Sequence, residues 1–258
     1  MRKKYIFLDL DGTIIDHDTN SIPQLTRDSI QLAQENGHEV IIATGRPKAL
    51  FYDVEKELGI HSYIANNGRI VVYHENMIFS DPIPKEILDK LVQLAKQEEI
   101  DIAYEGHEIF ALESRYNNLS KKFSRRFHLD DPVYIPGFYK SHAVYQVIMY
   151  YDKDDYKRFE TLIPELGFHY SCEYGLDVNM RSGLKEIGVK KVIEHLGVSI
   201  EDTIAIGDGY NDITMLETVN LGIAMKDAPN ALKEVADFIT DSAGNGGIYH
   251  AFKRYNII

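Results

Sequence analysis

The sequence has little cysteine and no long apolar runs. Its 258 residues include a single cysteine, Cys172, so an intramolecular disulfide cannot form, which is typical of a reducing compartment. The apolar stretch near the N-terminus is about five residues long, shorter than the ~7 residues of a signal-peptide core. No apolar run approaches the ~18 residues of a membrane helix. We therefore expect a soluble, cytoplasmic protein with no membrane partner.

Positive charge is also scarce, because 28 Lys and Arg residues face 40 Asp and Glu residues, for a formal net charge of −12. Nucleic-acid backbones require a cationic surface, so we expect no nucleic-acid partner. One cluster of basic residues stands out in the sequence, around Phe123 and Phe127. It consists of Lys121, Lys122, Arg125 and Arg126. We favour a solvated helix face with aromatic anchors over the alternative, a collar that attracts anionic substrates.

Residues 1–80 alternate between strand-like and helix-like stretches. Strands are predicted at Tyr5–Leu8, Glu39–Ala43 and Ser62–Ala65, and helices at Leu25–Asn36 and Pro47–Leu58. Each helix is followed by a glycine, the residue expected just after a helix C-terminus. The strands are apolar without polar alternation, which is typical of a parallel sheet covered on both faces.

The same alternation returns after residue 180. The predicted elements are helix Gly188–His195, strand Thr203–Ile206, helix Asp212–Thr218, strand Leu221–Ala224, helix Asn230–Val235, strand Phe238–Ile239 and helix Ile248–Tyr255. The fold class predicted is therefore α/β, with a doubly wound, Rossmann-like parallel-sheet core made of residues 1–80 and 180–258.

Residues 81–179 have a different pattern. Asp81-Pro-Ile-Pro84 is a plausible hinge, since both prolines restrict the backbone around them. Short strands and helices follow, of which Lys85–Gln97 has the clearest helical apolar stripe. We expect an inserted α+β domain with an antiparallel sheet.

Two carboxylates follow the first strand, at Asp9 and Asp11. Side chains at i and i+2 of a strand point the same way, so both should meet at the strand's end. Two carboxylates held close together repel each other, so their proximity implies a bound cation, a shared proton or both. The alternative is structural, since Asp-Gly is common in turns.

Polar groups also follow two other predicted strands. The Thr44 hydroxyl and the backbone N–H groups of Gly45 and its neighbours could bind an anion, although Thr44 taken alone is more often a helix N-cap. Asp208 and Asn211 lie in a glycine-rich loop, where the structural alternative is a turn with Asp212 capping a helix. Strand-end carboxylates and a backbone carbonyl suit Mg²⁺, which prefers oxygen ligands.

These segments together resemble the four ordered motifs of the haloacid dehalogenase superfamily. The matching residues are Asp9-Leu-Asp11-Gly-Thr13, Ala43-Thr44-Gly45-Arg46, Lys185 and Gly207-Asp208-Gly-Tyr-Asn211-Asp212. The inserted domain, Ala65-Asn66-Asn67-Gly68 and Gly222-Ile-Ala-Met225 resemble the Cof-type phosphatases of that superfamily. The resemblance covers essentially the whole chain.

The resemblance implies a role for each matched residue. Asp9 would be the nucleophile and Asp11 the general acid and base. The Mg²⁺ cofactor would bind the Asp9 carboxylate, the Asp11 backbone carbonyl and Asp208. Lys185 would be catalytic and would bind the transferring phosphoryl group, together with Thr44, the Gly45 N–H and Asn211. Asp212 would orient metal-bound water or Lys185, while Arg46 and Asn67 could contact the substrate.

The chain departs from the family pattern at two places. Lys185 is followed by Glu186 where the family usually has Gly, and Glu186 could pair with Lys185 and reduce its effective charge. Lys190 or Lys191 could then replace Lys185, although a place at the helix start favours Lys185. Lys226-Asp227 stands where Gly-Asn is common.

We therefore predict a magnesium-dependent phosphatase that acts on small phosphomonoesters through an aspartyl phosphate. The expected substrate is a small phosphorylated metabolite, either a sugar phosphate or a phosphorylated cofactor, with the inserted domain as a cap that sets specificity. The alternatives are a phosphomutase acting on sugar phosphates and a catalytically slow phospho-ligand sensor. A monomer and a homodimer both remain open.

Overall fold

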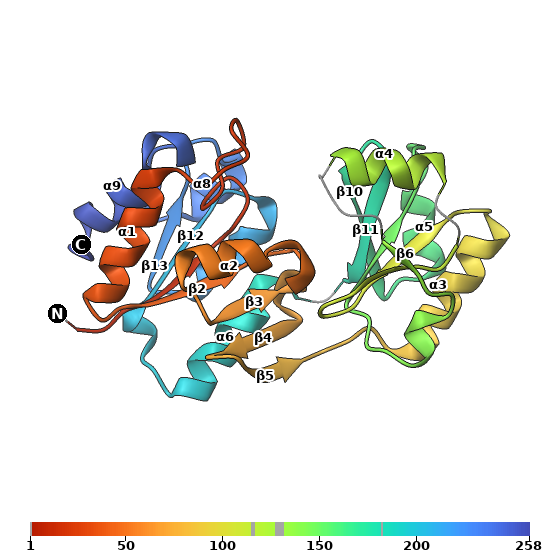
Figure 1. Cartoon of the computed structure of the whole chain (residues 1–258), viewed down its shortest axis with the longest axis horizontal. Coiled ribbons are helices and arrows are strands. Elements are labelled where there is room, and N and C mark those ends of the chain that lie inside the picture. The colour runs from red at the N-terminus through yellow and green to blue at the C-terminus, as the bar shows by residue number, and fades with distance from the viewer. Residues whose placement is uncertain (1, 115–116, 127–131, 182) are drawn as a thin grey trace. The chain divides into compact units, whose positions relative to one another are not determined.

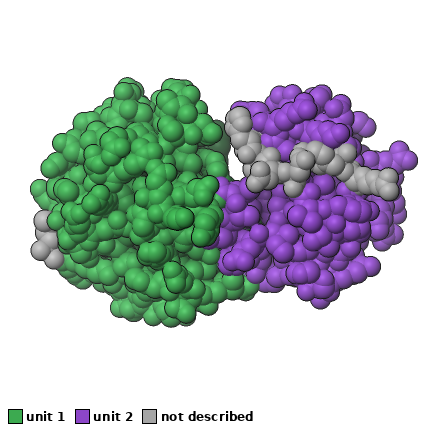
Figure 2. Space-filling model, in the orientation of Figure 1, with its two compact units in different colours: residues 1–46, 51–80, 184–258 green, residues 47–50, 81–183 purple. Residues whose placement is uncertain are grey.

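The computed structural model describes residues 2–114, 117–126, 132–181 and 183–258, and its chain divides into two compact units (Figures 1 and 2). The first unit comprises residues 1–46, 51–80 and 184–258, and the second comprises residues 47–50 and 81–183. Within the described residues, no helix is both long enough and apolar enough to cross a membrane.

The first unit is built on an eight-stranded sheet in the order β14-β13-β12-β1-β2-β3-β4-β5. The strands are β1 (Tyr5–Leu8), β2 (Glu39–Ala43), β3 (Tyr63–Ala65), β4 (Ile70–Tyr73), β5 (Asn76–Ser80), β12 (Thr203–Gly207), β13 (Leu221–Ala224) and β14 (Phe238–Ile239). The six strands from β14 to β3 are parallel, whereas β4 and β5 pair antiparallel at one edge. The predicted α/β fold class is confirmed, with this edge hairpin as an addition.

The helices of this unit are α1 (Gln24–Glu35), α2 (Tyr52–Leu58), α6 (Lys185–Leu196), α7 (Ile213–Thr218), α8 (Asn230–Val235) and α9 (Gly247–Arg254). Side chains of α6, α7 and α8 share one buried cluster with Phe7 of β1. Ile6 and Leu8 point to the opposite face of the sheet, where they are buried as well. Because both faces of β1 are covered, the strand is apolar throughout, as the sequence predicted.

The carboxyl ends of three central strands lie at the same level. β1 lies between β12 and β2, and Leu8 is aligned with Ile206 on one side and with Ile42 on the other. Residues that follow these strands therefore emerge side by side at one edge of the sheet. This register positions the site.

One predicted helix is broken. The single helix expected over Pro47–Leu58 is instead a short 3₁₀ turn at Lys48–Leu50, and α2 begins at Tyr52. Phe51 between them has a non-helical backbone, with φ −142°. Its ring is buried and packs edge-on against Tyr63 at 5.3 Å, so tertiary packing overrides the local helical pattern.

The second unit contains a six-stranded sheet in the order β10-β11-β9-β6-β7-β8. Its strands are β6 (Ile102–Glu105), β7 (Phe110–Leu112), β8 (Val133–Tyr134), β9 (Gln146–Met149), β10 (Leu166–Cys172) and β11 (Gly175–Met180), and its helices are α3 (Lys85–Gln97), α4 (Asn118–Arg126) and α5 (Lys157–Leu162). All pairs are antiparallel except β7 with β8. Helices α3 and α5 pack on one face, and Phe123 of α4 packs on the other.

The basic cluster lies on α4. Its four cationic residues are exposed, whereas Phe123 is buried, so the interpretation as a solvated helix face with an aromatic anchor is confirmed there. Phe127 lies outside the described residues.

Candidate active site

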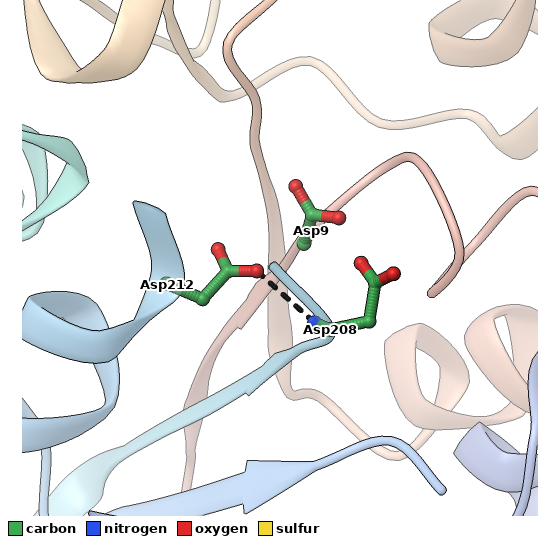
Figure 3. A group of neighbouring side chains, drawn as sticks. All are labelled: Asp9, Asp208 and Asp212. Carbon is green, nitrogen blue, oxygen red and sulfur yellow. Dashed lines mark hydrogen bonds between the residues drawn. The ribbon is translucent and has the colours of Figure 1, made fainter. Parts of the chain in front are cut away.

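Three carboxylates meet at the carboxyl edge of the central sheet (Figure 3). Asp9 directly follows β1, and its backbone N–H donates to the Ile206 carbonyl at 2.9 Å, so the strand pairing fixes its position. Asp208 directly follows β12, and Asp212 immediately precedes α7. One oxygen atom from each carboxylate lies within 4.8 Å of the others.

Lys185 supplies the cation of this cluster. It is the first residue of α6, and its side chain is fully buried. The ammonium group donates to Asp9 Oδ1 and, at 2.7 Å, to Asp212 Oδ1. Burial lowers the pKa of this ammonium group, but the Asp212 and Asp9 carboxylates outweigh burial and leave the pKa above its ordinary value. Lys185 is therefore charged at neutral pH.

Both oxygens of Asp212 already accept hydrogen bonds. Its Oδ1 accepts from Lys185, while its Oδ2 accepts from the backbone N–H groups of Asp208 at 3.0 Å and Gly209 at 2.9 Å. The carboxylate thus closes the loop after β12 and orients Lys185 at the same time. This geometry replaces the alternative in which Asp212 only caps a helix, since its side chain makes no capping bond to α7.

The negative charges in the cluster repel one another. Burial raises the pKa of Asp9 well above its ordinary value, and the carboxylates of Asp212, Asp208 and Asp11 raise it further against the opposing effect of Lys185. Burial likewise raises the pKa of Asp208. Ionising both groups at neutral pH therefore has a free-energy cost that a bound cation would offset.

The donor set fits a hard divalent cation. Asp9, Asp208 and Asp212 carry three negative charges when ionised and Lys185 carries one positive charge, so one divalent ion would balance the cluster. Mg²⁺ is usually bound through one or two carboxylates and keeps several waters. Because Asp212 already accepts three hydrogen bonds, one on Oδ1 and two on Oδ2, Asp9 and Asp208 are the carboxylates with more free acceptor sites to hold the ion.

The loop after Asp9 approaches Asp208 closely. Gly12 has φ +76°, and a Cβ atom there would lie 2.1 Å from Asp208 Oδ2, so only glycine fits. His17 Nε2 also lies 3.3 Å from Asp208 Oδ2. The His17 contact could not be predicted from the sequence, because the histidines show no metal-ligand spacing and this one comes from an irregular loop.

Asp11 pairs with Arg46. The Arg46 Nε donates to Asp11 Oδ2 at 2.9 Å, and its Nη2 donates to Asp11 Oδ1. The two side chains come from different strand ends, β1 and β2. Thus Asp9 and Asp11, although two residues apart, have different principal partners, an ammonium for the first and a guanidinium for the second.

Thr44 is not a helix N-cap. Its Oγ1 accepts from the Arg46 backbone N–H at 3.0 Å, which closes a short turn after β2, and no α-helix begins here. The helix start expected directly after this segment is therefore wrong, since the nearest helical turn is the 3₁₀ turn at Lys48–Leu50. The buried hydroxyl keeps its own proton for a further acceptor.

Asn67 connects two of the predicted phosphate-binding residues. Its Oδ1 accepts from Asn211 Nδ2 at 3.0 Å, and the same Oδ1 would lie 3.1 Å from a Cβ atom placed on Gly45. Asn67 and its neighbour Asn66 both have positive φ, a conformation that asparagine tolerates better than most residues. Asn67 was expected as a substrate contact, and the structure gives it a contact with Asn211 as well.

Glu186 does not pair with Lys185. Its Oε2 accepts instead from the Leu184 backbone N–H at 2.9 Å and from the Thr214 hydroxyl at 2.6 Å. The two candidate replacements for Lys185 lie elsewhere, since Lys190 is exposed and Lys191 pairs with Glu194. Lys226 and Asp227 are both exposed.

The site thus combines a doubly wound α/β sheet with three carboxylates at its carboxyl edge. A family model described as haloacid dehalogenase-like hydrolase matches residues 6–252. The chain belongs to this family and is one of its enzymes, and the predicted relation to the Cof-type phosphatases is confirmed.

Individual relatives span the whole chain. The protein YkrA of Bacillus subtilis (strain 168) is 34% identical over 258 residues, which is 100% of both chains. A crystal structure of a hypothetical protein from Geobacillus kaustophilus HTA426 matches with a TM-score of 0.95 at 29% identity, covering 99% of this chain and 100% of that one. The subclass IIB sugar phosphatase BT4131 matches with a TM-score of 0.86 at 27% identity, covering 99% and 100%.

Proposed function

We propose that this chain is a magnesium-dependent phosphatase that hydrolyses small phosphomonoesters through an aspartyl phosphate on Asp9. The observation that carries the proposal is the position of the Asp9 carboxylate, which is buried, bonded to Lys185 and adjacent to Asp208. A buried nucleophile between a fixed cation and a metal-ligand carboxylate suits attack on an anionic phosphoryl group.

In the first half-reaction, an Asp9 oxygen forms a bond to phosphorus and the ester P–O bond breaks. The carboxylic acid form of Asp11 gives its proton to the leaving oxygen. In the second half-reaction, Asp11 takes a proton from water as the water oxygen attacks phosphorus, and the bond to Asp9 breaks to release inorganic phosphate. The second half-reaction thereby returns to Asp11 the proton that the first half-reaction spent.

The remaining groups act on the charge of the transferring phosphoryl group. Lys185, the Gly45 N–H, the Thr44 hydroxyl and the Asn211 amide are the donors proposed for its oxygens. Mg²⁺ held by Asp9, Asp208 and the Asp11 carbonyl would screen the repulsion between the Asp9 carboxylate and the phosphate. Asp212 keeps Lys185 charged and in place.

We propose that residues 81–179 form a cap domain that selects the leaving group, with sugar phosphates as the first substrates to test. A row of polar side chains supports this choice. Glu105 is aligned with Gln146 on the neighbouring strand, and Asn179 Nδ2 donates to Gln146 Oε1 at 3.2 Å. These side chains point away from the face that α3 and α5 cover, and their amide and carboxyl groups can both donate and accept bonds to hydroxyls. The similar structure BT4131 is a sugar phosphatase.

The central test is hydrolysis of p-nitrophenyl phosphate with and without MgCl₂. The parent protein should be active only with the metal, and Asp9→Asn should lose at least about 10³-fold in kcat, because the amide cannot form the covalent intermediate. Asp28→Asn, at an exposed carboxylate on α1, is the matched control. Undiminished hydrolysis by Asp9→Asn would show that Asp9 is not the nucleophile.

The substrate proposal has its own test. Gln146→Leu and Asn179→Leu should lower kcat/KM for hexose phosphates by about tenfold or more, since each removes hydrogen bonds to hydroxyl groups. Their activity on p-nitrophenyl phosphate should stay within about twofold of the parent, because that leaving group has no hydroxyls to recognise. Equal losses on both substrates would contradict a role in selecting sugars.

A further inference from the structure

The carboxylate of Glu186 joins the beginnings of two helices. A single oxygen, Oε2, accepts from the Leu184 backbone N–H, immediately before α6, and from the Thr214 hydroxyl, in the first turn of α7. Both distances, 2.9 and 2.6 Å, are those of well-formed hydrogen bonds. We call Glu186, Leu184 and Thr214 with these two bonds the Glu186 bridge.

Two residues of the candidate active site are close neighbours of the bridge in the sequence. Lys185 lies between Leu184 and Glu186, and Asp212 lies two residues before Thr214. The ion pair from Lys185 Nζ to Asp212 Oδ1 also joins α6 to the start of α7. Two connections therefore run in parallel between the same helix ends, one through the charged pair and one through Glu186.

The N-cap of α6 makes no side-chain capping bond. Leu184 is the N-cap residue and has no side-chain acceptor for the orphan N–H groups of the first turn. On its other side, the backbone of Gly68 approaches so closely that a Cβ there would lie 2.3 Å from the Leu184 carbonyl oxygen. Leu184 is therefore held by Gly68 on one side and by Glu186 on the other.

We infer that Glu186 is a positioning residue, which holds the α6 and α7 starts in register so that Lys185 contacts Asp9 and Asp212 together. The inference rests on the proposed function for its catalytic consequence, but the bridge itself is a property of the fold. Misplacing a catalytic group by about 1 Å can cost on the order of 10²-fold in rate, so a support for the Lys185 backbone matters to turnover.

A different role for Glu186 would be electrostatic. A carboxylate next to Lys185 in sequence could reduce the charge of the ammonium group, and removal of Glu186 would then strengthen phosphate binding. The contacts argue against this role, because the Glu186 oxygen accepts from Leu184 and Thr214, whereas Lys185 is bonded to Asp9 and Asp212.

Two pairs of variants separate the roles. Glu186→Gln keeps an acceptor oxygen without the charge, and Glu186→Ala removes both. Thr214→Ser keeps the hydroxyl donor, and Thr214→Val removes it. If Glu186 is a positioning residue, the kcat of Glu186→Gln and of Thr214→Ser should stay within about twofold of the parent value. Glu186→Ala and Thr214→Val should lower kcat by about tenfold, with KM changed less than twofold. The double variant Glu186→Ala/Thr214→Val should be no slower than the slower single variant, because one bridge is lost in each case.

A second readout does not depend on activity. Amide hydrogen exchange, followed by mass spectrometry, should speed up in Glu186→Ala for peptides that contain Leu184 and for peptides that contain Asp212–Thr214, with little change in Glu186→Gln. Glu194→Ala is the matched control, since exposed Glu194 lies on the same helix and pairs only with Lys191 among the ion pairs of the described residues.

The outcomes are distinct. Unchanged exchange in Glu186→Ala, or faster exchange with unchanged kcat, overturns the inference. If Glu186→Gln and Glu186→Ala change kcat and exchange equally, the charge of Glu186 is what matters, and the inference is overturned as well. If the parent lacks magnesium-dependent phosphatase activity, the proposed function fails, while the exchange data still decide whether the Glu186 bridge exists.

Discussion

The guanidinium of Arg46 and the carboxylate of Asp11 face each other as a two-bond pair, with Arg46 Nε 2.9 Å from Asp11 Oδ2. Such paired contacts fix the plane of the carboxylate as well as its position. Arg46 thereby has a role besides the substrate contact first expected of it: it orients the group proposed as general acid and base.

The Arg46 contact predicts an effect that depends on the leaving group. Arg46→Ala should lower kcat for an alkyl phosphate such as glycerol 2-phosphate by about tenfold or more, because an alkoxide needs a well-oriented proton donor. Hydrolysis of p-nitrophenyl phosphate should fall less, since p-nitrophenolate leaves without protonation. Steady-state kinetics on both substrates make the comparison. A raised KM with unchanged kcat would indicate that Arg46 serves only as a substrate contact.

Removal of the buried cation should destabilise the protein. Lys185→Met leaves Asp9 and Asp212 without their counter-charge and should lower the free energy of unfolding by about 3–5 kcal/mol in EDTA at pH 7. Lys185→Met/Asp212→Asn should recover part of that loss, because one of the uncompensated charges is gone. Urea denaturation of the parent and both variants measures this. A double variant no more stable than the single would contradict the charge argument.

Magnesium should stabilise the folded protein through Asp208. A ligand at 100 times its Kd adds about 2.7 kcal/mol to folding, so MgCl₂ should raise the Tm of the parent by several degrees over its value in EDTA. Asp208→Asn should lose most of this rise while keeping or raising the Tm in EDTA, since it removes a charge beside Asp9. Thermal scans at several MgCl₂ concentrations are the measurement, and an equal rise in both proteins would place the ion elsewhere.

The second unit should show a pH-dependent stability that arises from Asp177. Burial raises the pKa of this carboxyl group to about 6, against the opposing effect of a hydrogen bond from Ser171. A raised folded pKa means that the contribution to stability is complete below the ordinary value near 3.8 and is lost as the pH rises through 6.

Asp177→Asn should remove this dependence. The variant should gain up to about 2 kcal/mol over the parent at pH 7.5 relative to their difference at pH 4.5, because the amide stays neutral and can still accept from Ser171. Urea titrations of both proteins at the two pH values provide the test. A pH-independent difference would show that Asp177 is ionised without a burial penalty.

Much of the site could be predicted because a parallel sheet brings strand ends together. Apolar strands followed by Asp9, Thr44 and Asp208 implied one shared edge, and the register of β12, β1 and β2 places them there. The contacts of His17 with Asp208 and of Arg46 with Asp11 could not be predicted, since they depend on the conformation of irregular loops.

Two features of the fold were missed for local reasons. The β4–β5 hairpin turns at His74 and Glu75, which both have positive φ without being glycine or asparagine, so the usual turn signal is absent. The break before α2 comes from the burial of Phe51 against Tyr63, a contact between residues twelve positions apart that no helical pattern encodes.

The pairing of β1 with β12 sets the order in which a growing polypeptide can assemble this enzyme. β1 cannot pair with β12 until Thr203 has been synthesised, whereas residues 81–183 form one continuous segment that is already complete by then. The strand that leads to Asp9 is therefore made before residues 81–183 and meets its β12 partner only after them. The carboxyl edge of the central sheet, where Asp9 and Asp208 lie, is therefore assembled only after the second unit has been synthesised.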